Sequence, residues 1–312
     1  MEKRRALKRL RFLLPLAGVC AAFAALVNLA GAEKLPAALQ RPLDAANEAA
    51  GGLFYRPAGL TVEFIDVGQG DSALLLCGGK SMLIDAGKPN EASAVENALL
   101  QAGVTRLDYA LGTHPDDDHI GGLADVLRRF GAKTVLFPPV AGDTDSYRAF
   151  AAAAGACGGI THVRAGFSGT LGGAAFRLVG PLRAYADTND MSLVLRLTYG
   201  SRAFLFTGDA SAAAEADMLA AHENLRADVL KAGHHGSATA TSPAFLRAVA
   251  PRYAVLSVGA GNSYGLPGRS VTQELAGAGA AILRTDLDGT VTFWTDGRAL
   301  RARTENSRAG AG

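Results

Sequence analysis

The stretch His114-Pro115-Asp116-Asp117-Asp118-His119 gathers imidazole and carboxylate side chains within six residues. It follows the apolar residues 107–112, which the pattern predicts to be a short strand, and α/β enzymes place their sites at strand ends. Imidazole and carboxylate ligands suit Zn, Mn or Fe, and two such sets close together suit a two-metal hydrolytic site. The structural alternative is a polar surface loop that caps the helix expected from residue 122. The candidate ligands are His114, Asp116, Asp118 and His119.

Two later segments repeat the arrangement of an apolar strand that ends in residues of metal-binding type. Residues 204–208 run into Asp209, a lone acid placed where a carboxylate can bridge two metals, although an ordinary turn or helix cap gives the same pattern. Residues 229–236 carry His234 and His235 between glycines. Lone histidines are usually structural, but a histidine pair at a glycine-flanked strand end favours a functional site.

The composition is typical of a globular protein, with 49% hydrophobic and 19% charged residues in a chain of 312, and it excludes a disordered or fibrous class. Beyond residue 32 there are 25 basic and 28 acidic residues, which gives a net charge of −3. This part lacks the broad basic surface of a protein that coats nucleic acid, so a polyanionic substrate must be attracted locally, as two divalent ions would do. Only Cys77 and Cys157 follow the N-terminal segment, which excludes a disulfide framework and a cysteine zinc site.

The N-terminus predicts an export signal or a membrane anchor. Six basic side chains precede an uncharged stretch over residues 12–32, which is long enough to span a bilayer. Ala30-Gly31-Ala32 also has the small-residue pattern that signal peptidase accepts, so retention in the membrane and cleavage near Ala32 both remain open. Either outcome predicts an extracytoplasmic protein. Residues 33–58 are rich in alanine and contain three prolines, and we expect them to form a linker or tether.

From residue 59 onward, strands and helices alternate, which predicts one α/β domain over residues 59–300. Residues 301–312 are expected to form a disordered tail. The predicted strands are 60–67, 72–77, 81–85, 107–112, 133–137, 175–179, 192–199, 202–207, 229–231, 253–257, 281–283 and 290–295, and the predicted helices are 91–102, 122–130, 146–154, 210–221 and 243–249.

Four motifs resemble, in their order, the metal motifs of the metallo-β-lactamase superfamily: Asp85-Ala-Gly after a strand, His114-x-Asp-x-Asp-His119, Thr207-Gly-Asp209 and Gly233-His-His-Gly-Ser237. The resemblance covers residues 60–296. Three longer motifs resemble more narrowly the soluble hydrolase domain of the ComEC family of competence DNA-uptake proteins. They are Asp66-Val-Gly-Gln-Gly-Asp-Ser72, His114-Pro-Asp-Asp-Asp-His-Ile-Gly-Gly122 and Gly259 followed by Asn262-Ser-Tyr-Gly265.

This resemblance implies a four-layer αββα sandwich with two divalent metal ions, Zn or Mn, at one edge. By motif position, His114 and Asp116 would bind one ion, and Asp209 would bridge the two ions. His235 is preferred over His234 because the superfamily ligand usually precedes a glycine directly. The ligands of the second ion would be Asp118, His119 and His235.

Two departures from the family pattern bear on the chemistry. Asp116 stands where the wider superfamily commonly has His, and this extra carboxylate makes Mn²⁺ a serious rival to Zn²⁺. Leu266 stands where the ComEC-like pattern Asn-x-Tyr-Gly-His-Pro has His, so any proton transfer or phosphate contact by that His is absent here.

Further roles are implied for residues beside the ligands. Asp118 and His234 are the expected catalytic residues, with His234 contacting the scissile phosphate or acting as an acid. Asp85 is expected to brace the metal loop through hydrogen bonds to its backbone, and Asn189 to be another ligand or a substrate contact. The remaining candidates for substrate binding or bracing are Asp71, Lys231, Ser237, Asn262 and Tyr264.

These features predict an exported metal-dependent hydrolase, most simply a phosphodiesterase or nuclease that acts on DNA or a related phosphodiester through a metal-activated hydroxide. One alternative is another envelope metallo-hydrolase, such as a phosphocholine esterase or a lactamase, and a second is a catalytically silent binding module, because one fold hosts all of these. No Walker A or dinucleotide motif is present, so no nucleotide cofactor is expected. Only one apolar stretch reaches membrane length, so we do not expect a transport pore.

Overall fold

The computed structural model describes residues 59–306, which belong to one compact unit that begins at Gly59. The predicted signal or anchor at residues 1–32 and the predicted tether at 33–58 lie outside the described residues. Among the helices of the described part, none has the length and apolar character needed to cross a membrane.

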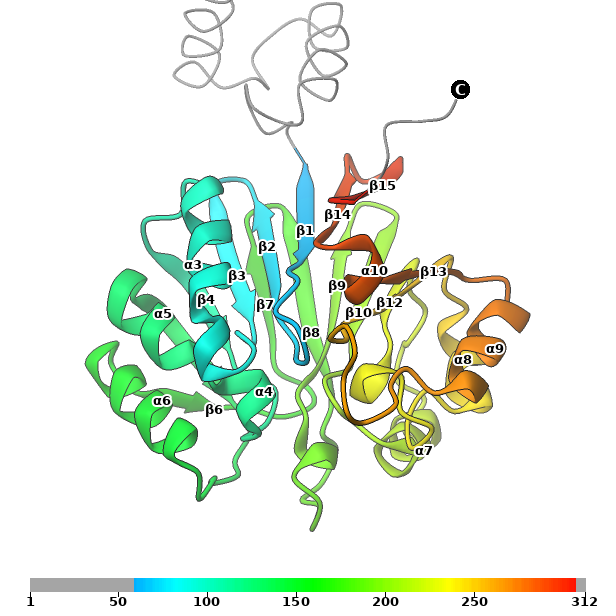
Figure 1. Cartoon of the computed structure of the whole chain (residues 1–312), viewed down its shortest axis with the longest axis horizontal. Helices are drawn as coiled ribbons and strands as arrows, with labels where there is room; N and C mark the ends of the chain where they lie inside the picture. Colours follow the sequence, from blue (N-terminus) through cyan, green and yellow to red (C-terminus); the bar gives the residue numbers. More distant parts are fainter. Residues whose placement is uncertain (1–58, 307–312) are drawn as a thin grey trace, which may run out of the picture. The chain divides into compact units, whose positions relative to one another are not determined.

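Two sheets pack face to face and form the centre of the domain (Figure 1). The first has the strand order β15-β14-β1-β2-β3-β4-β5-β6 and the second β13-β12-β11-β10-β9-β8-β7. Phe64 of the first sheet and Phe206 of the second stack in the layer between them, with ring centroids 5.6 Å apart. The strands of the first sheet are β1 (Leu60–Phe64), β2 (Ala73–Cys77), β3 (Lys80–Ile84), β4 (Leu107–Leu111), β5 (Ala132–Phe137), β6 (Ile160–His162), β14 (Val291–Thr295) and β15 (Leu300–Thr304), and those of the second are β7 (Ser168–Leu171), β8 (Ala174–Gly180), β9 (Val194–Tyr199), β10 (Arg202–Phe206), β11 (Val229–Lys231), β12 (Tyr253–Leu256) and β13 (Ala281–Arg284).

Helices cover the outer face of each sheet and complete the four layers (Figure 1). Apolar side chains three and four residues apart decide which face of a helix is buried: α5 buries Leu123, Val126, Leu127 and Phe130 against the first sheet. The predicted α/β sandwich is therefore confirmed. The first sheet is covered by α3 (Ala92–Gln101), α5 (Leu123–Phe130) and α6 (Asp145–Ala156), and the second by α7 (Ala212–Ala220), α8 (Pro243–Val249) and α9 (Arg269–Gly277).

The central strands of each sheet run parallel, and this brings the loops that carry the metal motifs to one edge of the sandwich. In the first sheet β3, β4 and β5 are parallel, and in the second β10, β11 and β12 are parallel. The loops after β4 and β10 meet there, since the His119 Nε2 atom lies 3.2 Å from the Asp209 Oδ1 atom. The carboxyl ends of both parallel sets therefore build one site.

The strand β15 corrects the expectation that the chain is disordered from residue 301. It pairs antiparallel with β14 over its whole length, and Leu300 at its start is buried. Charged side chains such as Arg301 and Arg303 are common on the exposed edge strands of sheets, and here they gave the segment the polar pattern of a tail.

Candidate metal centre

The motif after β4 folds into a turn that leads into the single helical turn α4 (Asp117–Ile120). His114 and His119 are fully buried, whereas the Asp116 and Asp118 side chains are 44% and 26% exposed. Asp116 occupies the N-cap position of α4, but its side chain accepts no capping hydrogen bond. Its Oδ2 atom lies instead 3.7 Å from the His114 Nε2 atom. A purely structural role as a helix cap is therefore excluded for this carboxylate.

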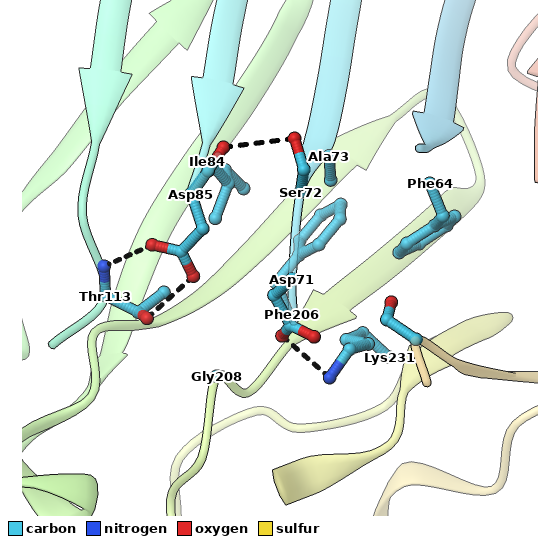
Figure 2. A pocket seen from close by; sticks show the side chains of 11 residues that line it. Phe64, Asp71, Ser72, Ala73, Ile84, Asp85, Thr113, Phe206, Gly208 and Lys231 are labelled. Atoms are coloured by element: carbon cyan, nitrogen blue, oxygen red, sulfur yellow. Dashed lines mark hydrogen bonds and ion pairs between the residues drawn. The ribbon is translucent and has the colours of Figure 1, made fainter. Parts of the chain in front are cut away.

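Asp85, directly after β3, braces the loop between Thr113 and His119 through hydrogen bonds. The Thr113 backbone N–H donates to its Oδ1 atom at 2.8 Å and the Thr113 hydroxyl to its Oδ2 atom at 2.7 Å (Figure 2). The His119 Nδ1 atom lies 2.9 Å from the same Oδ2 atom. A buried carboxylate at Nδ1 fixes the proton there, which leaves Nε2 free as a metal ligand. Asp85 is thus in a bracing position and does not face the Nε2 atoms.

His114 is oriented by two hydroxyl groups. Its Nδ1 atom lies 3.0 Å from the Thr113 Oγ1 atom and 3.3 Å from the Ser192 Oγ atom. The Thr113 hydroxyl proton is used by Asp85, so this oxygen is available as an acceptor for a His114 Nδ1–H group. The Ser192 hydroxyl also accepts from the backbone N–H of Asp209 at 3.1 Å, which ties His114 to the loop after β10.

Asp209 lies at the centre of the histidines and is almost completely buried. Its Oδ1 atom is 3.2 Å from His119 Nε2, and its Oδ2 atom is 3.4 Å from His235 Nε2 and 3.6 Å from His234 Nε2. The preceding Gly208 adopts a φ of 51°, and a side chain there would crowd the loop against Ser192. The glycine therefore allows the close approach that brings this carboxylate between imidazoles from both sheets.

The short turn Gly233–Gly236 follows β11 and carries two histidines, of which one is buried and the other is partly exposed. His234 and His235 have φ values of 47° and 54°, a left-handed conformation that non-glycine residues adopt at a cost and that clusters at functional sites. His235 is buried, with Nδ1 2.9 Å from the Ser257 carbonyl oxygen and Nε2 3.4 Å from the Asp118 Oδ2 atom. The His234 side chain is 31% exposed.

Asp71 and Lys231 form a buried ion pair beside these residues, with Lys231 Nζ 2.7 Å from Asp71 Oδ2 (Figure 2). Burial alone would raise the pKa of Asp71, but Lys231 and His235 outweigh it and lower that pKa below its usual range. Ligand atoms of Asp71, His119, Asp209 and His235 lie within 4.8 Å of one another. Asp71, however, faces the Nδ1 atoms of His235, at 3.2 Å, and of His119, at 4.0 Å. It therefore lies on the Nδ1 side of both imidazoles, and its Oδ1 atom has no hydrogen-bond partner among residues 59–306.

The buried histidines share an arrangement that fits a bound cation. Each of His114, His119 and His235 has Nδ1 beside an oxygen, whereas Nε2 has no hydrogen-bond partner among the described residues. The Oδ1 atom of Asp209 is likewise without one. Buried polar atoms without partners are rare and call for a ligand. Burial raises the pKa of Asp209 and Asp118, but the neighbouring histidines more than offset it and keep both carboxylates ionised, as metal ligation requires.

Asn189 lies beside the exposed rim of this cluster, at the start of the 3-10 turn Asn189–Met191. The neighbouring Thr188 hydroxyl donates to the Asp116 Oδ1 atom at 3.4 Å, so this turn contacts the candidate ligand loop. The Oδ1 atom of Asn189 is buried and has no hydrogen-bond partner within residues 59–306. Its role as a ligand or substrate contact stays a prediction.

In the loop after β12, Asn262 braces its own backbone, which is one of the two roles predicted for it. The Asn262 Nδ2 group donates to the carbonyl oxygens of Gly259 and Leu266, and its Oδ1 atom accepts from the backbone N–H groups of Tyr264 and Leu266. These bonds use the donors and acceptors of the amide inside its own loop, so Asn262 is a loop brace. Tyr264 is 66% exposed. Ser237 bonds to the Thr239 hydroxyl at 2.9 Å, which in turn lies 3.2 Å from His234 Nδ1.

Three groups that orient the histidines were missed by the sequence patterns: Thr113, Ser192 and the carbonyl oxygen of Ser257. Thr113 directly precedes His114, and Ser257 directly follows β12. Their position at a strand end is therefore the sequence feature that could have identified them. Hydroxyl residues are common at such positions, and no spacing distinguishes those that contact an imidazole.

Comparison with known proteins identifies the family. The model of the metallo-beta-lactamase superfamily matches residues 65–149 and 167–260. Competence protein ComA of Neisseria gonorrhoeae is 34% identical over 252 residues, which cover 78% of this chain and 34% of that protein. ComE operon protein 3 of Bacillus subtilis (strain 168) is 30% identical over 252 residues, which cover 74% of this chain and 32% of that protein. The chain spans about a third of the length of these curated relatives.

A solved structure shows the same fold at low sequence identity. A mutant of the CmlA beta-hydroxylase superposes with a TM-score of 0.51 at 15% identity, over 84% of this chain and 60% of that chain. The family match includes the loops that carry His114, His119, Asp209 and His235. This chain belongs to the metallo-β-lactamase superfamily.

Proposed function

We propose that this protein is an exported metal-dependent phosphodiesterase that acts on DNA. The observation that carries the proposal is a buried cluster. In it the Nε2 atoms of His114, His119 and His235 have no hydrogen-bond partner among residues 59–306, and those of His119 and His235 lie beside the carboxylate of Asp209. Divalent ions, Zn or Mn, would supply there an activated water and positive charge that stabilises a developing oxyanion.

The protein's own contribution is to hold two sets of ligands with a shared carboxylate. His114 and Asp116 form one set, as the 3.7 Å separation of their Nε2 and Oδ2 atoms supports. The second set is Asp118, His119 and His235, with Asp118 Oδ2 3.4 Å from His235 Nε2. Asp209 is assigned to both sets by its motif position, and its two oxygens lie beside His119 and His235 of the second set.

His234 is the residue that we assign to proton transfer. It is the more exposed histidine of its turn, and its Nε2 atom lies 3.6 Å from Asp209 Oδ2, at the edge of the cluster. The Thr239 hydroxyl lies 3.2 Å from its Nδ1 atom and orients the ring. Because Leu266 replaces the histidine of the ComEC-like pattern, His234 would protonate the leaving oxygen without help from that loop.

Similarity to competence proteins supports a phosphodiester of DNA as the substrate. The carboxylate of Asp116 at the exposed rim supports the same class, because a carboxylate-rich ligand set suits harder ions such as Mn²⁺ than an all-histidine set does. Export rests on the apolar residues 12–32 that follow a basic N-terminus.

The test joins metal analysis to hydrolysis of bis(p-nitrophenyl) phosphate and of linear DNA by the purified protein. Asp209→Ala and His119→Asn should lose bound metal and both activities. The matched controls are Asp145→Ala, whose side chain is 99% exposed, and His222→Asn, at an exposed position, and both should behave as wild type.

The outcomes test the position of the metal centre and the identity of the substrate separately. Unchanged activity in Asp209→Ala and His119→Asn would show that the metal centre is wrongly placed. Cleavage of the ester without cleavage of DNA would retain the phosphodiesterase and exclude DNA as its substrate.

A further inference from the structure

A basic pocket lies away from the metal centre, on the second sheet. It has a volume of about 410 Å³, and its lining includes Arg196, Arg226 and Arg252. Its other lining residues come from the starts of β10, β11 and β12, or from just before them, whereas the metal cluster follows the opposite ends of these strands. We call it the arginine pocket, defined by its three arginines.

Within residues 59–306, the positive charge of the arginine pocket is balanced only in part, by Asp228. Asp228 is the carboxylate in its lining, and both of its oxygens are engaged elsewhere: Oδ1 lies 2.9 Å from Arg202 Nη1, and Oδ2 accepts from the backbone N–H of Ala203 at 2.9 Å. Within residues 59–306, Arg196, Arg226 and Arg252 form no ion pair. The lining of the pocket therefore holds three arginines and one carboxylate, and that carboxylate is paired with Arg202 outside the lining.

Two of the arginines are held in place by neighbouring groups. The Arg196 Nε–H group donates to the Arg226 carbonyl oxygen at 2.9 Å, which leaves its terminal nitrogens as donors. Arg252 lies over the Tyr253 ring, 5.1 Å from its centroid. Arg196 is half-buried, and burial lowers the pKa of its guanidinium because the charged form is partly desolvated. An anion in the pocket would relieve that cost.

We propose that the arginine pocket binds a phosphate-bearing anion. Guanidinium forks match the paired oxygens of a phosphate, and the negative charge of one terminal phosphate, or of successive backbone phosphates, would balance several arginines. The volume is within the range that holds a small molecule such as a nucleotide. The phosphate belongs either to a free anion or mononucleotide, or to the backbone of a nucleic-acid strand. The proposal does not depend on the metal centre or on its activity.

The experiment uses the full chain, freed of metal with a chelator so that phosphate cannot bind at the metal centre. Isothermal titration with inorganic phosphate and with a mononucleotide should show binding. Arg196→Gln and Arg252→Gln should each weaken it about tenfold or more, because each removes charge-assisted hydrogen bonds. Arg303→Gln on β15 removes the same charge from an exposed site on the other sheet and should leave the affinity unchanged.

A labelled single-stranded oligonucleotide, followed by fluorescence anisotropy, distinguishes the sources of the phosphate. Competition by inorganic phosphate, with loss of oligonucleotide binding in Arg252→Gln, would identify a strand as the ligand. Binding of the small anions alone would identify a free phosphate or nucleotide. Arg252 is exposed, so its variant tests the pocket even if Arg196→Gln unfolds. Absence of phosphate binding by the wild type, or equal weakening in Arg252→Gln and Arg303→Gln, would overturn the proposal.

Discussion

The Oδ2 atom of Asp85 lies 2.9 Å from the Nδ1 atom of His119, and both side chains are buried. The contact joins the end of β3 to the helical turn α4, two segments that lie 34 residues apart. It turns the Nε2 atom of His119 toward Asp209, at 3.2 Å. The metal centre thus depends on a carboxylate that would not itself bind metal.

Asp85→Asn should weaken metal binding by about 10–100-fold, because the amide keeps the size of the side chain but removes the charge that orients His119. Competition of the protein with a chelating dye measures this affinity. Asp125→Asn, at an exposed position on α5, is the matched control and should bind metal as the wild type does. An unchanged affinity in Asp85→Asn would show that the contact does not support the ligand.

Asp116→His should shift metal preference toward Zn²⁺ by about tenfold or more, since imidazole is a softer ligand than carboxylate. The measured quantity is the ratio of the Zn²⁺ and Mn²⁺ dissociation constants. Asp117→His is the control, because this neighbouring side chain is exposed on α4. A ratio that stays constant in Asp116→His would mean that Asp116 is not a metal ligand.

The fold could be predicted where a segment's own sequence marks a strand or a helix. The predicted bounds of β11 (Val229–Lys231) and α8 (Pro243–Val249) match the structure, because an apolar run marks the first, and Ser242 and Pro243 mark the start of the second. In contrast, β6 (Ile160–His162) and β7 (Ser168–Leu171) were missed. They are short and mostly exposed, and pairing with neighbouring strands defines them, which no local pattern reveals.

The sequence predicted which imidazoles and carboxylates gather at the strand ends, but not all of the contacts that support them. His114, His119, Asp209 and His235 follow apolar strands whose ends meet at one edge of the sandwich. There the centroid of the His119 ring lies 4.1 Å from that of His114 and 5.2 Å from that of His235. The ion pair that supports them links Lys231 to a residue far away in the sequence, and sequence spacing carries no signal for such a contact.

Lys231→Met should destabilise the metal-free protein by about 3 kcal/mol, because it leaves the buried Asp71 carboxylate without its nearest cation. Adding Asp71→Asn should recover part of this loss. The free energies of unfolding in urea for the wild type, both single variants and the double variant give the coupling energy. Lys133→Met is the control: its side chain is 53% exposed and its partner Asp108 keeps a second cation, Lys80, so the loss should be at most about 1 kcal/mol.

The double variant tests whether Lys231 and Asp71 stabilise the fold through their interaction with each other. A loss in the double variant as large as the sum of both single losses would contradict an interaction between Lys231 and Asp71.

Metal affinity should rise with pH between about pH 6 and pH 8, because metal must displace protons from the histidines. Burial lowers the pKa of His119 and His235, but Asp209 together with Asp85 or Asp71 raises both well above 6.5 in the metal-free protein. Their contribution to stability is therefore complete below pH 6.5 and is lost as the pH rises through the raised values.

The lowered pKa of Asp209 affects stability in the opposite direction and at lower pH than the histidines do. The stability that Asp209 contributes is present above the usual carboxyl range and is lost as the pH falls through the lowered pKa. Metal-free protein should therefore become less stable from about pH 6.5 upward, as urea unfolding would show, while bound metal removes this loss. Titration calorimetry in two buffers of different ionisation enthalpy counts the protons released by metal. His235→Gln should release fewer, and a metal affinity that is constant across the window would contradict protonated histidines in the metal-free site.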